Sequence, residues 1–588
     1  MPGPPFEYDS ITDALLRLEN ASEFGARFIP RSGKPSFYPY KDVLKRAKSV
    51  AGTLQQEGLN PGECVGIIIP TSINFLDAFL GVQLAGGIPA ALYPPVRLGR
   101  LNEYYDSTRK MLRKINARIL ITDNRVKKIL GPVVDGLESV NRIHTAENLH
   151  RDNPWAPVSI NPEIPAFLQF SSGSTREPKA VVISHSNLIA NLEMMGSIFF
   201  KYYSREMLQV VCWLPLYHDM GLVGCMLNGL YHHTTVNYIE PEHFITRPAI
   251  WLQTISRFRS GASPAPQFAY GLCEKRIRDD EMRGVDLSSW LIAFNGAEPL
   301  DLESMERFCR RFSRWGFRDS TMTPVYGLAE ATLAATFSDI QSPPAVVEFD
   351  PVRLREEDRA EEGKGLKLVS MGRPMEGLEL RICDEKDDPL ADGRVGTIML
   401  KGSSITRGYY NDTSTTYETI RNGWLDTGDI GFIYKDELFI VGRSKDIIII
   451  RGRNIAPQDI EATLDRIPGV RTGCTVAVSS NIEGKGEQLI VLVEKDQNNP
   501  RPEEELRKKI KEHLVAQISV APYHIQLLEP GVLPRTSSGK KRRSDALKLF
   551  LSGDLAPPEK MGPMKLLHKI GKSQLAWGRF YLKLLKSK

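Results

Sequence analysis

The chain has 588 residues, 41% of them hydrophobic and 25% charged, which is ordinary usage for a globular protein and excludes a disordered, collagen-like or coiled-coil chain. No apolar run reaches the ~18 residues that a membrane-spanning helix needs. The N-terminal residues show no basic stretch followed by an apolar one, so we expect no secretory signal. Seven scattered cysteines without CxxC spacing predict reduced thiols and a cytoplasmic protein.

The net charge of +5 is concentrated in the last residues of the chain. Residues 560–588 contain eight Lys or Arg and no Asp or Glu, which leaves 68 basic and 71 acidic side chains in residues 1–559. The body of the protein therefore lacks the basic field that nucleic acid attracts, and we expect no nucleic-acid partner.

Hydrophobic patterns along the chain predict an α/β protein. Apolar residues repeat with helical spacing in 41–58 and 103–116. Short apolar runs typical of buried strands occupy 65–69, 118–122 and 208–213. Alternation of this kind favours helices packed on mostly parallel sheets.

A small-residue loop, Gln169-Phe-Ser-Ser-Gly-Ser-Thr-Arg-Glu-Pro-Lys179, follows one apolar run and precedes another. Small residues allow backbone N–H groups and hydroxyls to converge on an anion, as they do in phosphate-binding loops. The chain contains no Walker A, GxGxxG or GxSxG pattern, so those nucleotide and hydrolase classes lack their signatures. Taken alone, the loop could equally be a surface turn.

Six further motifs follow this loop in order. They are Trp213-Leu-Pro-Leu-Tyr-His-Asp-Met-Gly-Leu222, Asn295-Gly-Ala-Glu298, Pro324-Val-Tyr-Gly-Leu-Ala-Glu-Ala-Thr332, Trp424-Leu-Asp-Thr-Gly-Asp429, Gly442-Arg-Ser-Lys-Asp446 and Leu533-Pro-Arg-Thr-Ser-Ser-Gly-Lys540. The ordered set resembles the adenylate-forming (acyl-activating) enzyme superfamily, which includes acyl-CoA synthetases, luciferases and the adenylation domains of peptide synthetases. The resemblance covers about residues 10–550.

The resemblance implies activation of a carboxylate by ATP with Mg²⁺, and it assigns a role to each motif. The implied site residues are Ser171, Ser172, Gly173, Ser174, Thr175 and Lys179 for the ATP phosphates; Asn295, Gly296, Ala297, Glu298, Tyr326 and Gly327 for adenine; Asp429 and Arg443 for ribose; Glu330 for Mg²⁺; Lys540 as the catalytic lysine; His218 and Asp219 at the acyl site; and Lys445 as the hinge. Arg176 and Ala180 replace glycines that the family has in the phosphate loop.

Single residues of this set also have ordinary structural interpretations. Tyr326 could be a core aromatic, Asp429 a turn former, and His218 with Asp219 a buried pair. The run Lys540-Lys-Arg-Arg543 could be a solvated basic segment or a nucleic-acid patch.

Four features resemble fatty acyl-AMP ligases among the members of the superfamily. They are Arg176, the 213–222 segment, Ser263–Tyr270 (in which Gln267 replaces the usual asparagine) and a charged stretch near 348–369. Nine of the twelve residues in 353–364 are charged, which predicts a solvated surface excursion. The resemblance implies a fatty acid substrate and transfer of the acyl group to an acyl carrier protein in trans. The alternatives are a long-chain acyl-CoA synthetase and a non-catalytic acyl-nucleotide-binding scaffold.

The family also implies the domain organisation. We expect a large α/β N-terminal domain with several subdomains (1–442), a hinge (443–446), and a small, mobile α+β C-terminal domain (447–552) that carries Lys540. Residues 553–588 would form a linker and a basic tail.

The tail has the pattern of an amphipathic basic helix. Trp577, Phe580, Tyr581, Leu584 and Leu585 share one face, and Arg579, Lys583 and Lys586 lie opposite. This pattern suits an anionic membrane surface, which would make the enzyme peripheral to the inner face of the membrane. A helix that docks on the protein body, or on a partner such as the acidic carrier, would show the same pattern.

Overall fold

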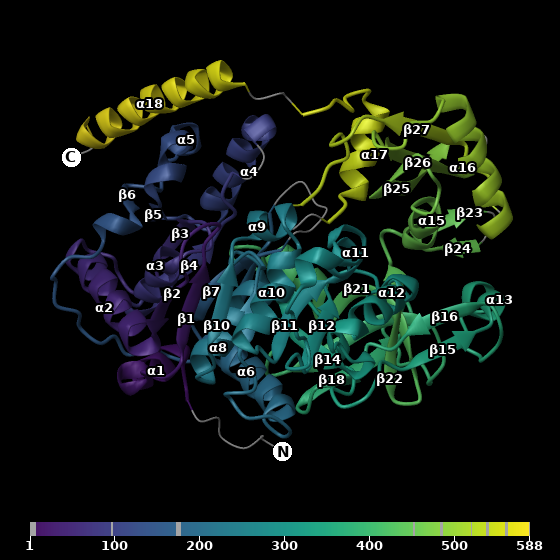
Figure 1. Ribbon diagram of the computed structural model, residues 1–588. Helices are drawn as coiled ribbons and strands as arrows, with labels where there is room; N and C mark the ends of the chain where they lie inside the picture. The colour runs from purple at the N-terminus through teal and green to yellow at the C-terminus, as the bar shows by residue number, and fades with distance from the viewer. Residues whose placement is uncertain are drawn as a thin grey trace.

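The computed structural model describes residues 8–95, 98–171, 178–450, 453–482, 486–518, 520–536, 540–558 and 562–586. Two large sheets form the core of the N-terminal domain, and helices cover their faces (Figure 1). The α/β class predicted from the sequence is confirmed.

The first sheet has nine strands, and its six central strands run parallel. Its spatial order is β17 (Arg373–Pro374), β14 (Ala334–Phe337), β13 (Met322–Gly327), β12 (Ile292–Gly296), β11 (Ala262–Pro266), β9 (Val210–Cys212), β10 (Val236–Ile239), β1 (Gly25–Ile29) and β2 (Ser36–Pro39). Parallel sheets need cover on both faces, which explains why β9 reads as a continuous apolar run, Val-Val-Cys.

The second sheet has six strands and is parallel except at its β7–β8 edge. Its order is β6 (Arg142–Thr145), β5 (Ile119–Thr122), β3 (Cys64–Ile68), β4 (Ile88–Ala91), β7 (Pro165–Phe170) and β8 (Ala180–Ser184). The strand-like runs at 65–69 and 118–122 are confirmed as β3 and β5, and the run at 208–213 contains β9.

The helices of the large domain fill the faces of both sheets. Their bounds are α1 (Ile11–Leu16), α2 (Tyr40–Gln56), α3 (Ile73–Leu84), α4 (Leu101–Lys114), α5 (Asn124–Val134), α6 (His185–Phe199), α7 (Asp219–Gly221), a π-helix (Leu222–Leu227), α8 (Asn228–Tyr231), α9 (Pro241–Thr246), α10 (Ala249–Phe258), α11 (Gln267–Arg276), α12 (Leu302–Phe312) and α14 (Thr413–Thr419). The helices predicted at 41–58 and 103–116 correspond to α2 and α4. Both end about two residues early, and past α4 Asn116 adopts a left-handed φ of 49° that leaves the helical conformation.

An antiparallel sheet completes the large domain and leads toward the smaller one. It consists of β18 (Leu378–Cys383), β19 (Gly396–Gly402), β20 (Ile420–Arg421), β21 (Trp424–Tyr434) and β22 (Glu437–Arg443). After β22 the chain forms a small α+β unit from β23 (Ile448–Ile450), β24 (Arg453–Ile455), α15 (Pro457–Leu464), β25 (Val470–Ile482), β26 (Gly486–Lys495), α16 (Glu503–Ile518), β27 (His524–Leu528) and α17 (Arg543–Leu551).

The charged excursion has more structure than the sequence predicted. It lies within an insertion made of β15 (Val346–Phe349), α13 (Pro351–Glu356) and β16 (Leu366–Val369). Phe349, Leu354 and Ala360 are buried against Phe432 and Phe439 of β21 and β22. Most charged side chains of the excursion are exposed, as a solvated surface segment requires, but the burial of Leu354 and Ala360 was not predicted.

The tail forms α18 (Pro563–Lys586), which returns across the large domain and lies along α5 (Figure 1). Trp577 and Phe580 are buried in this contact, and the indole Nε1 donates a hydrogen bond to the Lys127 carbonyl at 3.0 Å. Gly131 permits the close approach, because a Cβ there would lie 2.1 Å from the Ser573 carbonyl oxygen. The sequence-based assignment of Trp577 and Phe580 to a membrane face is wrong; this face docks on the protein body, as the alternative predicted.

The other residues named for that face differ in their surroundings. Tyr581 and Leu585 are exposed, whereas the side chains of Leu584 and Lys586 lie outside the described part of the chain. Arg579 pairs with Asp135 at 2.5 Å. Among the described helices, none combines the length and apolar character needed to cross a lipid bilayer.

Candidate active site

A cavity of about 2480 Å³ opens at the carboxyl ends of the central parallel strands. Pro266, Ala297 and Gly327, at or just after the ends of β11, β12 and β13, line one side, and Lys540 of the small domain lines another. Open parallel sheets bind their ligands at this edge, because the loops that follow the strands converge there. Most of the predicted site residues that the structure describes lie in this cavity or directly behind it.

Tyr326, Asp429 and Arg443 form a fixed polar chain on the cavity wall. The Tyr326 hydroxyl donates to Asp429 Oδ2 at 2.7 Å, and Arg443 Nε donates to Asp429 Oδ1 at 2.9 Å. Asp429 and Arg443 face each other because β21 and β22 pair with these two residues in register. The pKa of the Tyr326 hydroxyl is raised by burial and by the Asp429 carboxylate, so it remains a donor.

The six residues predicted for the adenine site divide into two layers. Ala297 and Glu298 line the cavity together with Tyr326 and Gly327, whereas Asn295 and Gly296 lie behind them. Asn295 is fully buried, and its Nδ2 donates to Gln267 Oε1 at 2.6 Å. The position of Gly296 must stay small, because a Cβ would lie 2.4 Å from the Val325 carbonyl oxygen.

Glu330 and Lys179 meet at a residue that the motifs did not include. Tyr409 donates from its hydroxyl to Glu330 Oε1 at 2.8 Å, and the Lys179 ammonium lies 5.2 Å from the centre of the Tyr409 ring. Tyr409 thus joins the expected metal-binding carboxylate to the expected phosphate-binding lysine. Its place in Arg407-Gly-Tyr-Tyr410 gave no signal of this in the sequence.

The phosphate loop is described only at its ends. The Ser171 N–H donates to the Lys179 carbonyl at 3.1 Å, which closes the loop, and both residues line the cavity. Ser172, Gly173, Ser174, Thr175 and Arg176 lie outside the described residues.

The positive charge of Lys540 acts on the pKa values of His218 and Glu298. Burial lowers the pKa of His218 to about 4, with Asp219 opposing this shift and Lys540 adding to it. Burial raises the pKa of Glu298, while the hydrogen bond from the Phe268 N–H and the charge of Lys540 act in the opposite direction. His218 is therefore neutral at pH 7, and the small domain in this arrangement brings Lys540 to the cavity.

The acyl-site motif continues into unusual backbone. Asp219 begins α7, its Oδ1 accepts from the Met220 N–H at 2.8 Å, and the π-helix Leu222–Leu227 follows at once. Single π-helical turns are frequent at functional sites. The rings of Phe199, Phe294 and Phe337 pack 5.4 to 5.8 Å apart and line the cavity, which gives it an apolar region.

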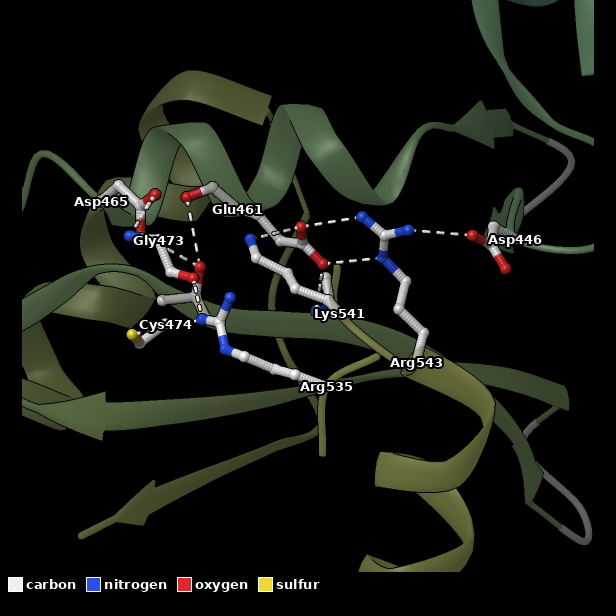
Figure 2. A network of polar contacts seen from close by, with 10 residues as sticks. Asp446, Glu461, Asp465, Gly473, Cys474, Arg535, Lys541 and Arg543 are labelled. Carbon is white, nitrogen blue, oxygen red and sulfur yellow. Dashed lines mark hydrogen bonds and ion pairs between the residues drawn. The ribbon is translucent and has the colours of Figure 1, made fainter. Parts of the chain in front are cut away.

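The basic run around Lys540 is held by buried acid rather than by solvent (Figure 2). Lys541 and Arg543 both bind Glu461, at 2.8 Å each, and Arg543 also binds Asp446 at 2.9 Å. Burial alone would raise the pKa of Glu461, but the two cations reverse this effect and hold it below its ordinary value. This network fixes the segment that follows Lys540, so the solvated-run interpretation does not hold for Lys541 and Arg543.

The described contacts between the small domain and the large one include three that the motifs did not predict. Arg100 donates to the Val532 carbonyl at 3.1 Å, Arg466 pairs with Glu303 at 2.8 Å, and Arg355 of the insertion pairs with Asp459 of α15 at 2.9 Å. Lys445, the expected hinge residue, is exposed at the cavity edge between Arg443 and Asp446.

The donor set suits a nucleotide with a divalent cation. An aromatic ring, a carboxylate and three cations (Tyr326, Asp429, Arg443, Lys179 and Lys540) share one cavity. In the described part of the chain no group of three His, Cys, Asp or Glu could hold a metal ion alone. Glu330 is a single carboxylate, which is the arrangement by which Mg²⁺ is shared with substrate phosphates.

Comparisons with known proteins decide the family. Residues 20–410 match the AMP-binding enzyme model, and residues 452–546 match the AMP-binding enzyme C-terminal domain. The chain belongs to the AMP-binding enzyme family. The resemblance seen in the motifs is thus confirmed, and the protein is an adenylate-forming ligase that uses ATP.

Two relatives of this AMP-binding enzyme are named for different acyl acceptors, an acyl carrier protein in one case and CoA in the other. It is 33% identical over 549 residues to the medium-chain-fatty-acid–[acyl-carrier-protein] ligase JamA of Moorena producens (88% of this chain, 90% of the relative). It is 32% identical over 532 residues to a putative acyl-CoA synthetase of Caulobacter vibrioides, with the same coverage. A solved structure from a study of fatty acyl-adenylate ligases of E. coli and L. pneumophila matches with a TM-score of 0.86, 31% identity, and coverage of 93% of this chain and 99% of that chain.

Proposed function

We propose that this enzyme activates a fatty acid to its acyl-adenylate and passes the acyl group to the phosphopantetheine thiol of an acyl carrier protein. The observation that carries the proposal is the single cavity in which Lys540, His218, Glu330 and Asp429 border a region lined by phenylalanine rings. An apolar region beside a nucleotide-compatible polar one fits a fatty acid whose carboxylate meets ATP.

In the first step a carboxylate oxygen attacks the α-phosphorus of ATP. A new P–O bond forms while the bond to the β-phosphate oxygen breaks, and pyrophosphate leaves with the electron pair of that bond. We assign to Lys540 the stabilisation of negative charge between the two anions that must approach. Tyr326 would hold the adenine ring, Asp429 with Arg443 the ribose, and Lys179 the phosphates.

Glu330, together with the nucleotide phosphates, would hold magnesium, which would supply positive charge to offset the charge of the leaving pyrophosphate. The Tyr409 hydroxyl would orient the Glu330 carboxylate for this role, because it already binds one of its two oxygens. A fixed ligand loses less freedom when the ion binds.

In the second step the carrier thiolate attacks the acyl carbon, and the bond to the AMP oxygen breaks. The insertion supports a carrier rather than free CoA as the source of the thiol. Arg355 ties α13 to Asp459 of the small domain, and Phe349 anchors the insertion on β21 and β22 of the large domain. We call this two-ended link between the insertion, the small domain and the large domain the strut. It would restrict the rotation of the small domain that CoA-dependent transfer needs, whereas a carrier docks outside and inserts only its phosphopantetheine arm.

The competing functions make different predictions. A long-chain acyl-CoA synthetase would form acyl-CoA as fast as it loads a carrier. A non-catalytic scaffold would release no pyrophosphate, and it would need neither Lys540 nor Glu330. Pyrophosphate exchange across a series of fatty acids, followed by mass detection of products with CoA or a holo-carrier, separates all three.

We further propose a cytoplasmic enzyme that contacts an anionic membrane surface through residues 560–588. All seven cysteines are free thiols, which supports a reducing compartment. Eight cationic side chains without an acid in the tail support attraction to acidic lipid. The buried positions of Trp577 and Phe580 require that a face of α18 other than the one first expected makes the contact.

A further inference from the structure

Helix α18 has a second apolar face that points away from the protein. Met564, Leu567, Leu575, Leu582 and Leu585 are each between 60% and 80% exposed. Their spacings of three, seven and eight residues place them along one side of the helix. We call these five residues the exposed stripe. Five large apolar side chains in one exposed line indicate an interaction surface rather than scattered surface residues.

The docked face lies on the opposite side of the same helix. Ser573, Ala576, Trp577 and Phe580 are buried against α5. The Ser573 hydroxyl accepts from the Gly131 N–H at 2.9 Å, which ties the two helices at their closest approach. The exposed stripe is therefore displayed by a helix that the protein body holds in place, so it needs no undocking to be available.

Cations occupy the sector between the two faces. Lys565, Lys572, Arg579 and Lys583 are exposed there, and residues 560–588 contain no acid. Arg579 and Lys583 reach Asp135 and Glu138 of the body, yet each keeps more than half of its side chain exposed. Long basic side chains beside an apolar stripe can bury their stems in lipid and keep their charges at the phosphate level.

We propose that the exposed stripe of α18 inserts into the interfacial region of an anionic lipid bilayer while the opposite face stays docked on α5. The assignment rests on the peripheral membrane contact proposed above and names the surface that makes it. A second copy of the chain is a poor occupant, because two identical helices would bring like charges together along their shared edge.

The placement of α18 links this surface to the cavity. The Lys569 ammonium donates to Asn102 Oδ1 at 3.1 Å, which joins the first turns of α18 to α4. Arg100, Glu103 and Ser107, at the start of α4 and within it, line the cavity. A bilayer on the exposed stripe would lie beside this wall, which suits an enzyme whose substrate partitions into lipid.

Vesicle sedimentation with three proteins tests the assignment. The stripe variant carries Leu567→Gln, Leu575→Gln and Leu582→Gln. The matched control carries Leu551→Gln, Met207→Gln and Val515→Gln, which are exposed apolar residues outside the tail. Each protein is mixed with phosphatidylcholine vesicles, with and without phosphatidylglycerol, at low and high salt.

The wild-type and control proteins should pellet with the anionic vesicles at low salt and less at high salt. The stripe variant should bind at least tenfold more weakly, because burial of even one leucine side chain in lipid contributes about a factor of ten to the binding constant. Adenylation of a water-soluble acid, and the melting temperature, should match wild type. Equal pelleting of wild type and stripe variant would overturn the assignment but leave the peripheral contact intact.

Two other outcomes would also overturn it. Failure of the wild type to bind any vesicle would remove both the contact and its assigned surface. Sedimentation equilibrium that shows a dimer in the wild type and a monomer in the stripe variant would make the stripe a subunit interface.

Discussion

The Tyr326 hydroxyl donates a hydrogen bond to Asp429 Oδ2 at 2.7 Å, although 103 residues separate the two along the chain. The bond joins β13 of the large parallel sheet to β21 of the antiparallel sheet. Arg443 occupies the other carboxylate oxygen, so the ring and the carboxylate are held before any ligand arrives. Preorganisation of this kind lowers the cost of binding a nucleotide.

Two substitutions of Tyr326 therefore distinguish the contribution of the ring from that of the hydroxyl. Tyr326→Phe keeps the ring but leaves a buried carboxylate one donor short, which costs about 1–3 kcal/mol at the site. We expect the KM for ATP to rise about tenfold, with a larger rise for Tyr326→Ala because the stacking surface is also lost. Steady-state kinetics of pyrophosphate release measure both, and an unchanged KM in Tyr326→Ala would remove the ring from the adenine site.

Lys540→Ala should abolish most adenylation while ATP still binds. Loss of one electrostatic stabiliser typically lowers the rate ~10²–10³-fold. Lys548→Ala, an exposed lysine of α17, is the control and should behave as wild type. Because Lys540 helps to depress the pKa of His218, that pKa should also rise in Lys540→Ala, which NMR of labelled histidines can follow. A near wild-type rate would exclude Lys540 from the mechanism.

Arg355→Ala should raise the use of free CoA relative to carrier. The change releases Asp459 and frees one end of the strut between the insertion and the small domain. Arg353→Ala is the matched control, since Arg353 lies on the same helix and its described ion pairs, with Glu357 and Glu361, stay inside the insertion. Product analysis with both thiols gives the ratio, and equal ratios in the two variants would contradict a role for the strut.

Stability should fall as the pH drops from about 6.5 to 4, in part because of His185. Burial lowers the pKa of His185 to about 4, so the folded state binds fewer protons than the unfolded state across this range. The site's contribution to the free energy of unfolding is fully present above pH 6.5. It is lost as the pH falls toward 4, a decrease of on the order of 3 kcal/mol. Melting temperatures of His185→Leu should depend less steeply on pH in this window; an identical slope would contradict the assignment.

Gly131→Val should displace α18 from α5. A Cβ at this position would lie 2.1 Å from the Ser573 carbonyl oxygen. Neither backbone can move far enough to relieve this clash while the helices stay packed. We expect faster proteolysis of the tail and exposure of Trp577, with a lower melting temperature. The control is Lys128→Val, at an exposed position of the same helix. Gly136 just after α5 has open space around its Cβ position, but its positive φ would strain any substitution.

The sequence predicted the elements and motifs whose signals are local. Apolar runs such as Val65–Ile69 identify buried strands, because both faces of a parallel sheet are covered. The seven motifs identified the family, since each lies in one short segment. Helix ends at α2 and α4 were displaced by about two residues, where a single left-handed residue such as Asn116 decides the boundary.

Contacts between distant segments could not be predicted from one sequence. Tyr409 meets Glu330 only after the chain has formed another sheet, and Arg355 meets Asp459 only across two domains. The composition of 353–364 concealed the anchoring by Leu354 and Ala360, because two apolar side chains among many charges suffice to join a small cluster around Phe349. The tail pattern identified an amphipathic helix but not which of its faces would dock.

The most direct test is the product formed when the purified enzyme, a fatty acid and ATP meet free CoA and a holo-carrier in competition. We predict fatty acid-dependent pyrophosphate release, an acyl-adenylate detectable without thiol, and acyl-carrier as the dominant product. Acyl-CoA formed as fast as any acyl-carrier would contradict the carrier assignment, and no pyrophosphate release with any fatty acid would contradict the proposed activity itself.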